Sequence, residues 1–391
     1  MNRSAKSPAA PRPSRPVFVC AHVSEVYGPV QALRQYLQES GFDFRFLTHP
    51  FPYTGLEGSL REDFRGGRLV GAQKLRRRSP GQGRQFLANL ASSLWQGLGR
   101  RTGWTIGIGN LNALAGLALR ALGRTERVCY YVIDHTPRRF ANPVLDFLYR
   151  WVDGICCRHC DLLWCLSDRI RQAKQERGAP ANRCVLVPVG ARLQDVARVP
   201  ASRRRPQVLV AMSHLTREKG IQLVLESFSR ILKKAPRARL EIVGTGPYEG
   251  ELRRQARDLG LGGSVAFLGL MDHARLFRYL PTCGVGLATY TEDSDNIAYF
   301  ADPTKPKEYL ACGLPVVVTR VPWIWEAVAD PKAPMGVAIG YRREDLVEAC
   351  LKLLKRPAFH RRCRSNALRF AQELDWTSIF NRAFDEMRAR E

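Results

Sequence analysis

The stretch between residues 302 and 317 contains side chains that can bind an anion beside one that can bind a sugar. A turn brings Thr304 and Lys305 to the start of a short predicted helix, whose free backbone N–H groups and positive dipole end favour an anion such as a diphosphate. Lys305 adds a cation for a departing phosphate. Glu308 lies one turn further along the same face, where its carboxylate can accept hydrogen bonds from vicinal ribose hydroxyls. The stretch therefore predicts a nucleotide-binding site.

Three other turns in the same half of the chain have residues suited to binding a nucleotide. Each of them follows a short apolar run that we interpret as a strand, at 208–212, 240–243 and 265–268. Open parallel sheets bind ligands at the carboxyl ends of their strands. The turns after these strands contain Ser213, His214, Lys219, Gly244, Gly246, Leu270 and Met271.

These motifs, in this order and spacing, resemble the C-terminal half of the retaining, GT-B-fold glycosyltransferases of family four. In that family, Glu308 would match a glutamate that is followed by a small residue, Gly, Pro and two valines. The resemblance makes the turn residues named above donor-binding candidates. It implies that Lys219 contacts the diphosphate of a nucleoside diphosphate sugar and that Glu308 holds the ribose. It also implies that the backbone near Leu270 and Met271 receives the base.

The sequence departs from the family pattern at two positions. His214 stands where the family often has an arginine, and Phe300 stands where it has the first glutamate of a pair. A neutral histidine binds phosphate less strongly, and a phenylalanine cannot hydrogen-bond to sugar hydroxyls. We expect Lys305 to replace the missing cation, and the backbone of 301–304 to hold the sugar.

The first half of the chain resembles the family more loosely. Gly28 occupies the place of its first glycine turn, where a backbone without a side chain lets a phosphate or an acceptor approach. Asp134 and His135 follow an apolar strand, and two roles stay open: Asp134 as general base if the enzyme inverts, or His135 as a partner of the donor sugar if it retains. The alternative is an aspartate that caps the next turn beside an exposed histidine. Arg138 and Arg139 could bind an anionic acceptor bidentately, or could be surface residues.

Strands alternate with helices in both halves, which predicts an α/β fold of two Rossmann-like, doubly wound parallel sheets with a cleft between them. The predicted parts are a disordered tail over 1–16, an acceptor domain over 17–197, a linker over 198–206, a donor-nucleotide domain over 207–372, and a C-terminal helix over 373–391 that the resemblance places back on the first domain. The 391-residue length is in keeping with two domains.

A formal charge of +25 indicates an anionic partner. Basic residues, including Arg76, Arg77 and Arg78, are concentrated between 61 and 101. A predicted helix in this region carries one apolar face made of Phe86, Leu87, Leu90, Leu94, Trp95 and Leu98. This combination favours contact with an anionic membrane surface or a lipid acceptor. The alternative is a solvated basic loop followed by an ordinary core helix.

Several other functions are not favoured by the sequence. No apolar run is long enough to span a membrane, the basic start lacks the apolar part of a signal peptide, and eleven irregularly spaced cysteines suggest reduced thiols, so we expect a cytoplasmic location. The cysteines at 156, 157, 160 and 165 with His159 lack the usual spacing of a zinc site. Asp293 and Asp295 lie in a polar loop, so we expect no bound metal and no cofactor; an incomplete glycine fingerprint argues against NAD.

We therefore expect a glycosyltransferase that moves a sugar from a nucleoside diphosphate sugar to a lipid-linked or polysaccharide acceptor at the cytoplasmic membrane face. Lys219, Lys305, Asp134 and His135 are the candidates for catalysis. Two alternatives stay open: a sugar-nucleotide epimerase of the same fold, and a non-catalytic protein that binds nucleic acid or membrane. The basic run has no recognisable nucleic-acid reading motif, so no nucleic-acid partner is expected.

Overall fold

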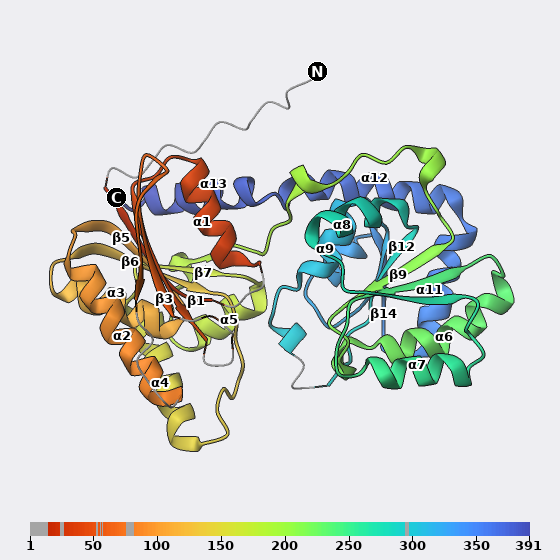
Figure 1. Ribbon diagram of the computed structural model, residues 1–391, viewed down its shortest axis with the longest axis horizontal. Helices are drawn as coiled ribbons and strands as arrows, with labels where there is room; N and C mark the ends of the chain where they lie inside the picture. Colours follow the sequence, from red (N-terminus) through yellow and green to blue (C-terminus); the bar gives the residue numbers. More distant parts are fainter. Residues whose placement is uncertain are drawn as a thin grey trace. The chain divides into compact units, whose positions relative to one another are not determined.

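A computed structural model describes residues 15–23, 27–51, 54, 56, 58–75, 82–293 and 297–391. The chain forms two compact units (Figure 1). The first contains Met1–Val189 together with Trp376–Glu391, and the second contains Gly190–Asp375. Both are α/β units, as the alternating pattern predicts. In the described part no helix has the length and apolar character needed to cross a membrane.

The first unit is built on an eight-stranded sheet in the order β4-β3-β2-β1-β5-β6-β7-β8. Its strands are β1 (Val17–Val23), β2 (Phe44–Pro50), β3 (Ser59–Arg65), β4 (Arg68–Leu75), β5 (Thr102–Ile108), β6 (Thr125–Val132), β7 (Leu162–Cys165) and β8 (Cys184–Leu186). The pairing is parallel except at β2–β3 and β3–β4. The central strands are buried on both faces. β1 and the second half of β6 accordingly read as apolar runs in the sequence, whereas the equally buried β5 contains two threonines and two glycines.

The helices of the first unit lie on both faces of this sheet (Figure 1). They are α1 (Pro29–Glu39), α2 (Gln82–Leu98), α3 (Asn110–Ala121), α4 (Pro143–His159), α5 (Asp168–Glu176) and α13 (Trp376–Arg388). α3 packs against both α2 and α4, whereas α13 packs against α1. The last helix therefore joins the first unit, although the second unit separates it in the sequence from the rest.

The second unit has a six-stranded parallel sheet in the order β11-β10-β9-β12-β13-β14. The strands are β9 (Val208–Met212), β10 (Arg239–Val243), β11 (Val265–Gly269), β12 (Val285–Ala288), β13 (Val316–Thr319) and β14 (Gly336–Ile339). The strand order reverses between β9 and β12. Such a switch point opens a crevice at the carboxyl ends of the strands, where doubly wound folds bind nucleotides.

The helices that the structure describes in the second unit flank its sheet: α6 (Ile221–Lys234), α7 (Glu249–Asp258), α8 (His273–Tyr279), α9 (Thr304–Ala311), α10 (Trp325–Val328), α11 (Arg343–Lys355) and α12 (Pro357–Glu373). Short 3-10 turns of the second unit cover Leu193–Asp195, Ala201–Arg203, Arg217–Lys219, Leu280–Thr282 and Ile297–Tyr299, and the first unit has one at Ala181–Arg183. Two clusters of buried apolar side chains, one including Phe228 and the other Tyr309, form the core of the second unit.

The division between the units falls between Val189 and Gly190, and the segment 198–206, where the linker was expected, lies inside the second unit. Arg205 ties this segment down: its side chain pairs with Glu241 at 2.7 Å and its N–H donates to the Thr282 carbonyl. The proline and arginine content that resembles a linker therefore belongs to a surface segment that packs on the second sheet.

The basic region from residue 61 is not a loop in the described part. Residues 59–65 and 68–75 form an antiparallel hairpin, in which Glu62 and Asp63 pair with Arg34 and Arg45. The predicted apolar helix is present as α2, but Leu87 and Trp95 are exposed while Gln85, Asn89 and Ser93 are buried. Leu94 and Leu98 of the predicted face pack against the core cluster of Phe18 and Leu119, while the buried polar side chains of α2 bond to His22, His49 and the Pro50 carbonyl.

Candidate functional site

The turn after β9 brings Lys219 to the switch point of the second sheet. It passes through the 3-10 turn Arg217–Lys219 and enters α6 at Gly220, whose φ of 70° is left-handed. A Cβ atom at Gly220 would lie 1.7 Å from the carbonyl oxygen of Thr289, just after β12. Only glycine allows this close approach, and the approach holds Lys219 against the carboxyl ends of β9 and β12.

The two glycines after β10 have a packing role. Gly244 has a φ of +119°, and a Cβ atom there would lie 1.8 Å from the carbonyl oxygen of Ser213. At Gly246 a Cβ atom would lie 2.4 Å from the Leu215 carbonyl oxygen, and Leu215 donates its N–H to Thr245. These glycines therefore let the turns after β9 and β10 lie against each other. His214 is exposed beside them, and the buried Ser213 hydroxyl donates to the His214 carbonyl.

Leu270 and Met271 follow β11 at the same edge of the sheet. Leu270 is 77% exposed, whereas Met271 is half-buried against the apolar cluster of Tyr309. The chain reaches them through Gly269, which has a φ of 68° and accepts a hydrogen bond from the Gly244 N–H. An exposed leucine on a turn at the carboxyl edge is a suitable surface for the flat face of a base.

Lys305 and Glu308 lie on the first turns of α9, which follows Pro303 and has no side-chain cap. Burial and the positive charge of Lys219 lower the pKa of Lys305, and the Glu308 carboxylate opposes the shift. Burial raises the pKa of Glu308, which Lys305 and His273 counteract. The structure thus brings the predicted residues Lys219, Lys305 and Glu308 together. Two neighbouring ammonium groups beside the uncapped start of a helix form a site that an anion would stabilise.

Tyr290 is a member of this site that sequence reasoning missed. Its side chain is buried, the Lys219 ammonium lies 5.7 Å from the centre of its ring, and its hydroxyl finds no hydrogen-bond partner in the part of the chain that the structure describes. Burial, with the nearby charges of Glu308 and Asp302, raises its pKa. A buried hydroxyl of this kind can hydrogen-bond to a ligand. Its position directly after an apolar strand was the available signal.

A buried ion pair stabilises the turn that precedes α9. Lys307 and Asp302 are both buried and in contact, and the second carboxylate oxygen of Asp302 accepts a hydrogen bond from the Trp323 indole at 2.8 Å. Burial lowers the pKa of Lys307 and the Asp302 carboxylate raises it. The pair fixes the turn that precedes Lys305. Phe300, whose ring meets Tyr299 edge to face, lies just before this turn.

In the first unit, Asp134 and His135 lie just beyond β6. Asp134 pairs with Arg139 at 2.6 Å, and Arg138 donates to the Ala141 carbonyl at 2.8 Å. His135 is 6% exposed, so it is not the exposed histidine of the alternative interpretation. Burial, then the charges of Lys174 and Arg177, lower its pKa to about 4. The imidazole is neutral at neutral pH and can exchange hydrogen bonds as either donor or acceptor.

Gly28 is the residue before α1, and its φ of −159° is extended. Its N–H donates to the Gln31 side chain at 3.0 Å, so the amide is already paired. A Cβ atom at this position would meet only the Gln31 side chain, at 3.8 Å, so the backbone does not require glycine here. The cluster Arg76, Arg77 and Arg78 and the residue Asp295 lie outside the described residues.

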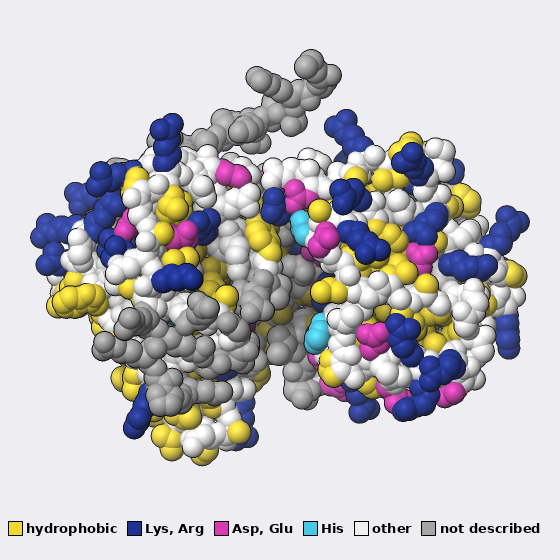
Figure 2. Space-filling model, viewed as in Figure 1, with side chains coloured by type: hydrophobic (Ala, Val, Ile, Leu, Met, Phe, Trp, Pro, Cys, Tyr) yellow, Lys and Arg dark blue, Asp and Glu magenta, His cyan; other side chains and the backbone are white. Residues whose placement is uncertain are grey.

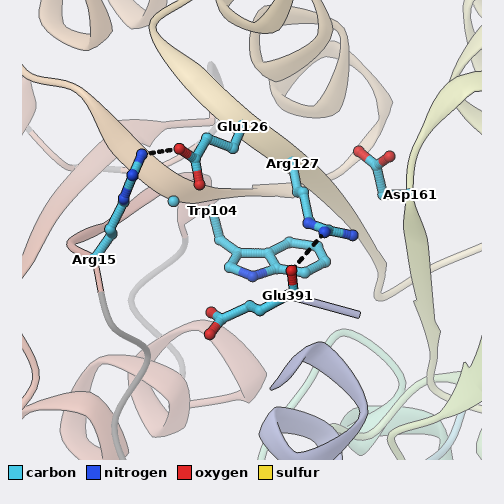
Figure 3. A pocket seen from close by; sticks show the side chains of 7 residues that line it. Arg15, Trp104, Glu126, Arg127, Asp161 and Glu391 are labelled. Atoms are coloured by element: carbon cyan, nitrogen blue, oxygen red, sulfur yellow. Dashed lines mark hydrogen bonds and ion pairs between the residues drawn. The ribbon is translucent and has the colours of Figure 1, made fainter. Parts of the chain in front are cut away.

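The cysteines and the possible metal ligands form no metal centre in the described part of the chain. All eleven cysteines are buried and free, and Cys156 donates to the carbonyl of Asn110. A separate pocket lies at the opposite, amino-terminal ends of β5 and β6 (Figure 3). Trp104 and Arg127 line it, with Arg127 also bonded to the Glu391 carbonyl at 3.0 Å. Open parallel sheets bind ligands at the carboxyl ends of their strands, so this pocket lies at the edge opposite to the expected site.

The chain matches two sequence families. Residues 195–370 match the family described as "Glycosyl transferases group 1", and residues 29–190 match the "Glycosyl transferase 4-like domain". The end of the second match and the start of the first, at 190 and 195, lie next to the division between the two units.

Two curated relatives share part of this sequence. An alpha-monoglucosyldiacylglycerol synthase of Streptococcus pneumoniae is 29% identical over 38% of this chain and 31% of its own length. A GDP-mannose-dependent alpha-(1-6)-phosphatidylinositol dimannoside mannosyltransferase of Mycobacterium tuberculosis is 28% identical over 63% of this chain and 65% of its own length. The matches thus span from about a third to just under two thirds of these relatives.

Solved structures share the fold over nearly the whole chain. Anabaena HepE in complex with UDP covers 96% of this chain and 100% of its own, with a TM-score of 0.71 and 15% identity. Sucrose-phosphate synthase of Thermosynechococcus elongatus covers 96% of this chain with a TM-score of 0.69 and 18% identity. Two family matches that together extend over both units, and a fold shared with these structures, lead to one conclusion: the chain belongs to the GT-B glycosyltransferases of the family-four type.

Proposed function

We propose that the protein transfers a sugar from a nucleoside diphosphate sugar to a lipid-linked or polysaccharide acceptor at the cytoplasmic face of a membrane. The observation that carries this proposal is the meeting of Lys219 and Lys305 beside Glu308 at the switch point of the second sheet. Two ammonium groups and the start of α9 suit a diphosphate, and the carboxylate suits a ribose.

In this proposal, catalysis comes from stabilising the negative charge that develops on the leaving group. As the bond between the sugar and the diphosphate breaks, negative charge grows on the phosphate, and Lys219 and Lys305 stabilise it. The site needs no metal for this role, because the two lysines and the α9 N–H groups supply positive charge at that place. The Tyr290 hydroxyl adds a hydrogen-bond donor within the same buried site.

In this proposal, the first unit binds the acceptor. His135 is neutral at neutral pH and lies at the carboxyl edge of its sheet, where it can hydrogen-bond to a sugar. The Asp134 carboxylate is already paired with Arg139 at 2.6 Å. This arrangement favours transfer with retention. Proton NMR of the new anomeric centre decides the point, because an inverted product would assign the general base to Asp134.

The names of the relatives support a glycolipid acceptor. One is a synthase of a glucosylated diacylglycerol and the other a mannosyltransferase of phosphatidylinositol dimannoside. The solved neighbour in complex with UDP supports a nucleotide donor. An epimerase of the same fold would turn over the donor with no acceptor, which a donor-only incubation reveals.

The first test is a thermal-shift screen of the whole protein with UDP, GDP, ADP and their sugars, since a ligand that binds the folded state raises Tm. We expect a shift with one base. Lys305→Ala should lower kcat/KM by about 100-fold, because it removes a cation from the developing charge. Lys233→Ala, at an exposed lysine in the last turn of α6, is the matched control. Full activity in Lys305→Ala, or no shift with any nucleotide, would contradict the proposal.

A further inference from the structure

α4 leaves most of its apolar side chains in solvent. Its first nine residues carry five exposed apolar side chains: Val144 at 63%, Leu145 at 49%, Phe147 at 60%, Leu148 at 46% and Trp151 at 54%. We call this set the α4 face. Amphipathic helices of globular proteins turn such side chains towards the core. Here the core side of the same turns is occupied by Asp146, which is 4% exposed. Contiguous exposed apolar surface of this kind marks an interaction site.

The α4 face is held in place by the protein itself. The Asn142 side chain accepts hydrogen bonds from the N–H groups of Val144 and Leu145, at 2.9 and 3.1 Å, and Pro143 occupies the first helical position. The buried Asp146 accepts from the Arg139 N–H at 2.7 Å. The helix therefore starts at a fixed place and needs no partner to form, so it presents a preformed apolar face.

In the described residues, no exposed Asp or Glu lies on α4, on α3, which packs against α4, or on α2, which packs against α3. Residues 82–124, which contain α2 and α3, include no Asp or Glu. On α4 both acids, Asp146 and Asp153, are buried. Exposed arginines stand next to the face at Arg138, Arg139 and Arg150. Arg150 is paired with the buried Asp146 at 2.9 Å and Arg139 with the half-buried Asp134 at 2.6 Å.

Further exposed apolar side chains lie on α2 and α3. Leu87 and Trp95 on α2 are 69% and 74% exposed, and Leu122 at the end of α3 is 61% exposed. α3 packs against both α2 and α4, so the three helices form one layer. Figure 2 shows hydrophobic and dark blue side chains next to each other at the lower edge of the unit that contains these helices. An apolar surface bordered by cations is the composition of interfacial membrane segments.

The position of α4 links this surface to the acceptor side of the first unit. α4 begins at Pro143, after the loop that follows β6 and contains Asp134 and His135. The exposed turns are those at the start of α4, so they lie towards the carboxyl edge of the sheet. A surface that binds there would bring lipid head groups to the edge at which this fold binds its substrates.

We propose that the α4 face docks on an anionic lipid bilayer, with its apolar side chains in the interface and Arg138, Arg139 and Arg150 at the phosphates. The proposal rests on the proposed function, since it states which surface brings a lipid-linked acceptor to the enzyme. The predicted contact through the basic region between 61 and 101 stays a separate prediction, because Arg76, Arg77 and Arg78 lie outside the described residues. A second copy fits less well, because a two-fold contact through this face would bring the same arginines together.

The test is flotation of the full-length protein with vesicles of phosphatidylcholine alone and with about one third phosphatidylglycerol. We expect binding to the anionic vesicles, weakened by salt. Phe147→Ser with Trp151→Ser should lower the bound fraction about tenfold, because two interfacial anchors are lost. The control is Leu69→Ser with Val70→Ser on β4, where the side chains are 50% and 57% exposed, and it should bind like the wild type. All these substitutions are at exposed positions, so Tm should change little.

Each outcome decides the proposal. Unchanged flotation of the Phe147, Trp151 variant, or no flotation of the wild type, overturns it, and an equal loss in the β4 control overturns the assignment to α4. A wild-type dimer that the variant loses, without vesicle binding, assigns the face to a second copy instead. The shift of Tm with nucleotide is measured in every variant. This shift should be the same in every variant. A variant that loses vesicle binding but keeps the shift has therefore lost docking and not donor binding.

Discussion

Lys305 and Lys307 are two residues apart on α9 and have opposite environments. Lys307 is fully buried and paired with Asp302, whereas Lys305 is half-buried near Lys219 and Glu308. In the sequence, both lysines precede Glu308, and nothing local distinguishes them. On a helix, residues two apart point in different directions, so only one of them can face the site. A buried ammonium also has to be paired, which makes Lys307 part of the scaffold.

The pKa of His135 makes a prediction for pH dependence. The folded-state pKa is lowered from 6.5 to about 4 by burial, with Lys174 and Arg177 in the same direction and Asp153 and Asp134 opposing. Between these values the unfolded chain binds more protons than the folded one, so stability present above pH 6.5 is lost as pH falls towards 4.

His135→Gln should remove that part of the acid sensitivity. We expect the urea midpoint of the wild type to fall more than that of the variant between about pH 7 and about pH 5. The comparison is internal, because His22 and His49, whose pKa values burial also lowers, are present in both proteins. If the urea midpoint changes equally with pH in the two proteins, folding does not lower the pKa of His135.

At the scale of elements, the site depends on turns that approach each other closely. The turn after β9 meets that after β12 at Gly220 and the turn after β10 at Gly244. Each contact is a glycine against a carbonyl oxygen, so backbone geometry rather than a side chain sets the position of Lys219. The structure shows a packing role for both glycines.

Gly244→Ala tests this account. The new Cβ atom would lie 1.8 Å from the Ser213 carbonyl oxygen at a φ of +119°, so the turn has to move. We expect a loss of more than about 1 kcal/mol in the free energy of unfolding, measured by urea denaturation, together with weaker nucleotide binding. Gly250→Ala on α7 is the control, since nothing lies within 4 Å of the added atom and α7 is a helix. The control should be as stable as the wild type or slightly more so.

At the scale of the whole molecule, the last helix completes the first unit. Phe384 of α13 stacks on Tyr36 and meets Trp164 edge to face, with ring centres 5.5 and 5.3 Å apart. The Tyr36 hydroxyl donates to Asn381 at 2.8 Å. The apolar core of one unit therefore depends on residues that follow the other unit in the sequence.

A chain that ends at Asp375 should show this dependence. Loss of Phe380, Phe384 and Met387 exposes the aromatic side chains beneath them, so the first unit should unfold at a lower temperature and bind a hydrophobic dye. Nucleotide binding by the second unit should persist, because its residues are intact. Melting of the truncated chain identical to that of the full chain would show that α13 contributes little.

Much of the architecture is readable in the sequence, since buried parallel strands are apolar throughout and helices repeat every three or four residues. Lys219, Lys305 and Glu308 were identified because a phosphate-binding turn and a helix start leave a local pattern. The hairpin of β3 and β4 was not identified, because its strands carry charged residues whose pairing partners are distant. β5 and α3 were also absent from the sequence-based assignment.

The sequence by itself determined the family and the two-sheet plan, and it predicted Lys219, Lys305 and Glu308 as donor-binding residues, because these depend on short motifs along the chain. Only the tertiary structure decided which apolar side chains are left in solvent, that Lys307 is paired inside the fold, and that Tyr290 joins the site. The physical reason is that burial and pairing are properties of contacts between distant segments. Periodicity along a helix such as α4 indicates an apolar face, but it does not state whether that face meets a core or a membrane.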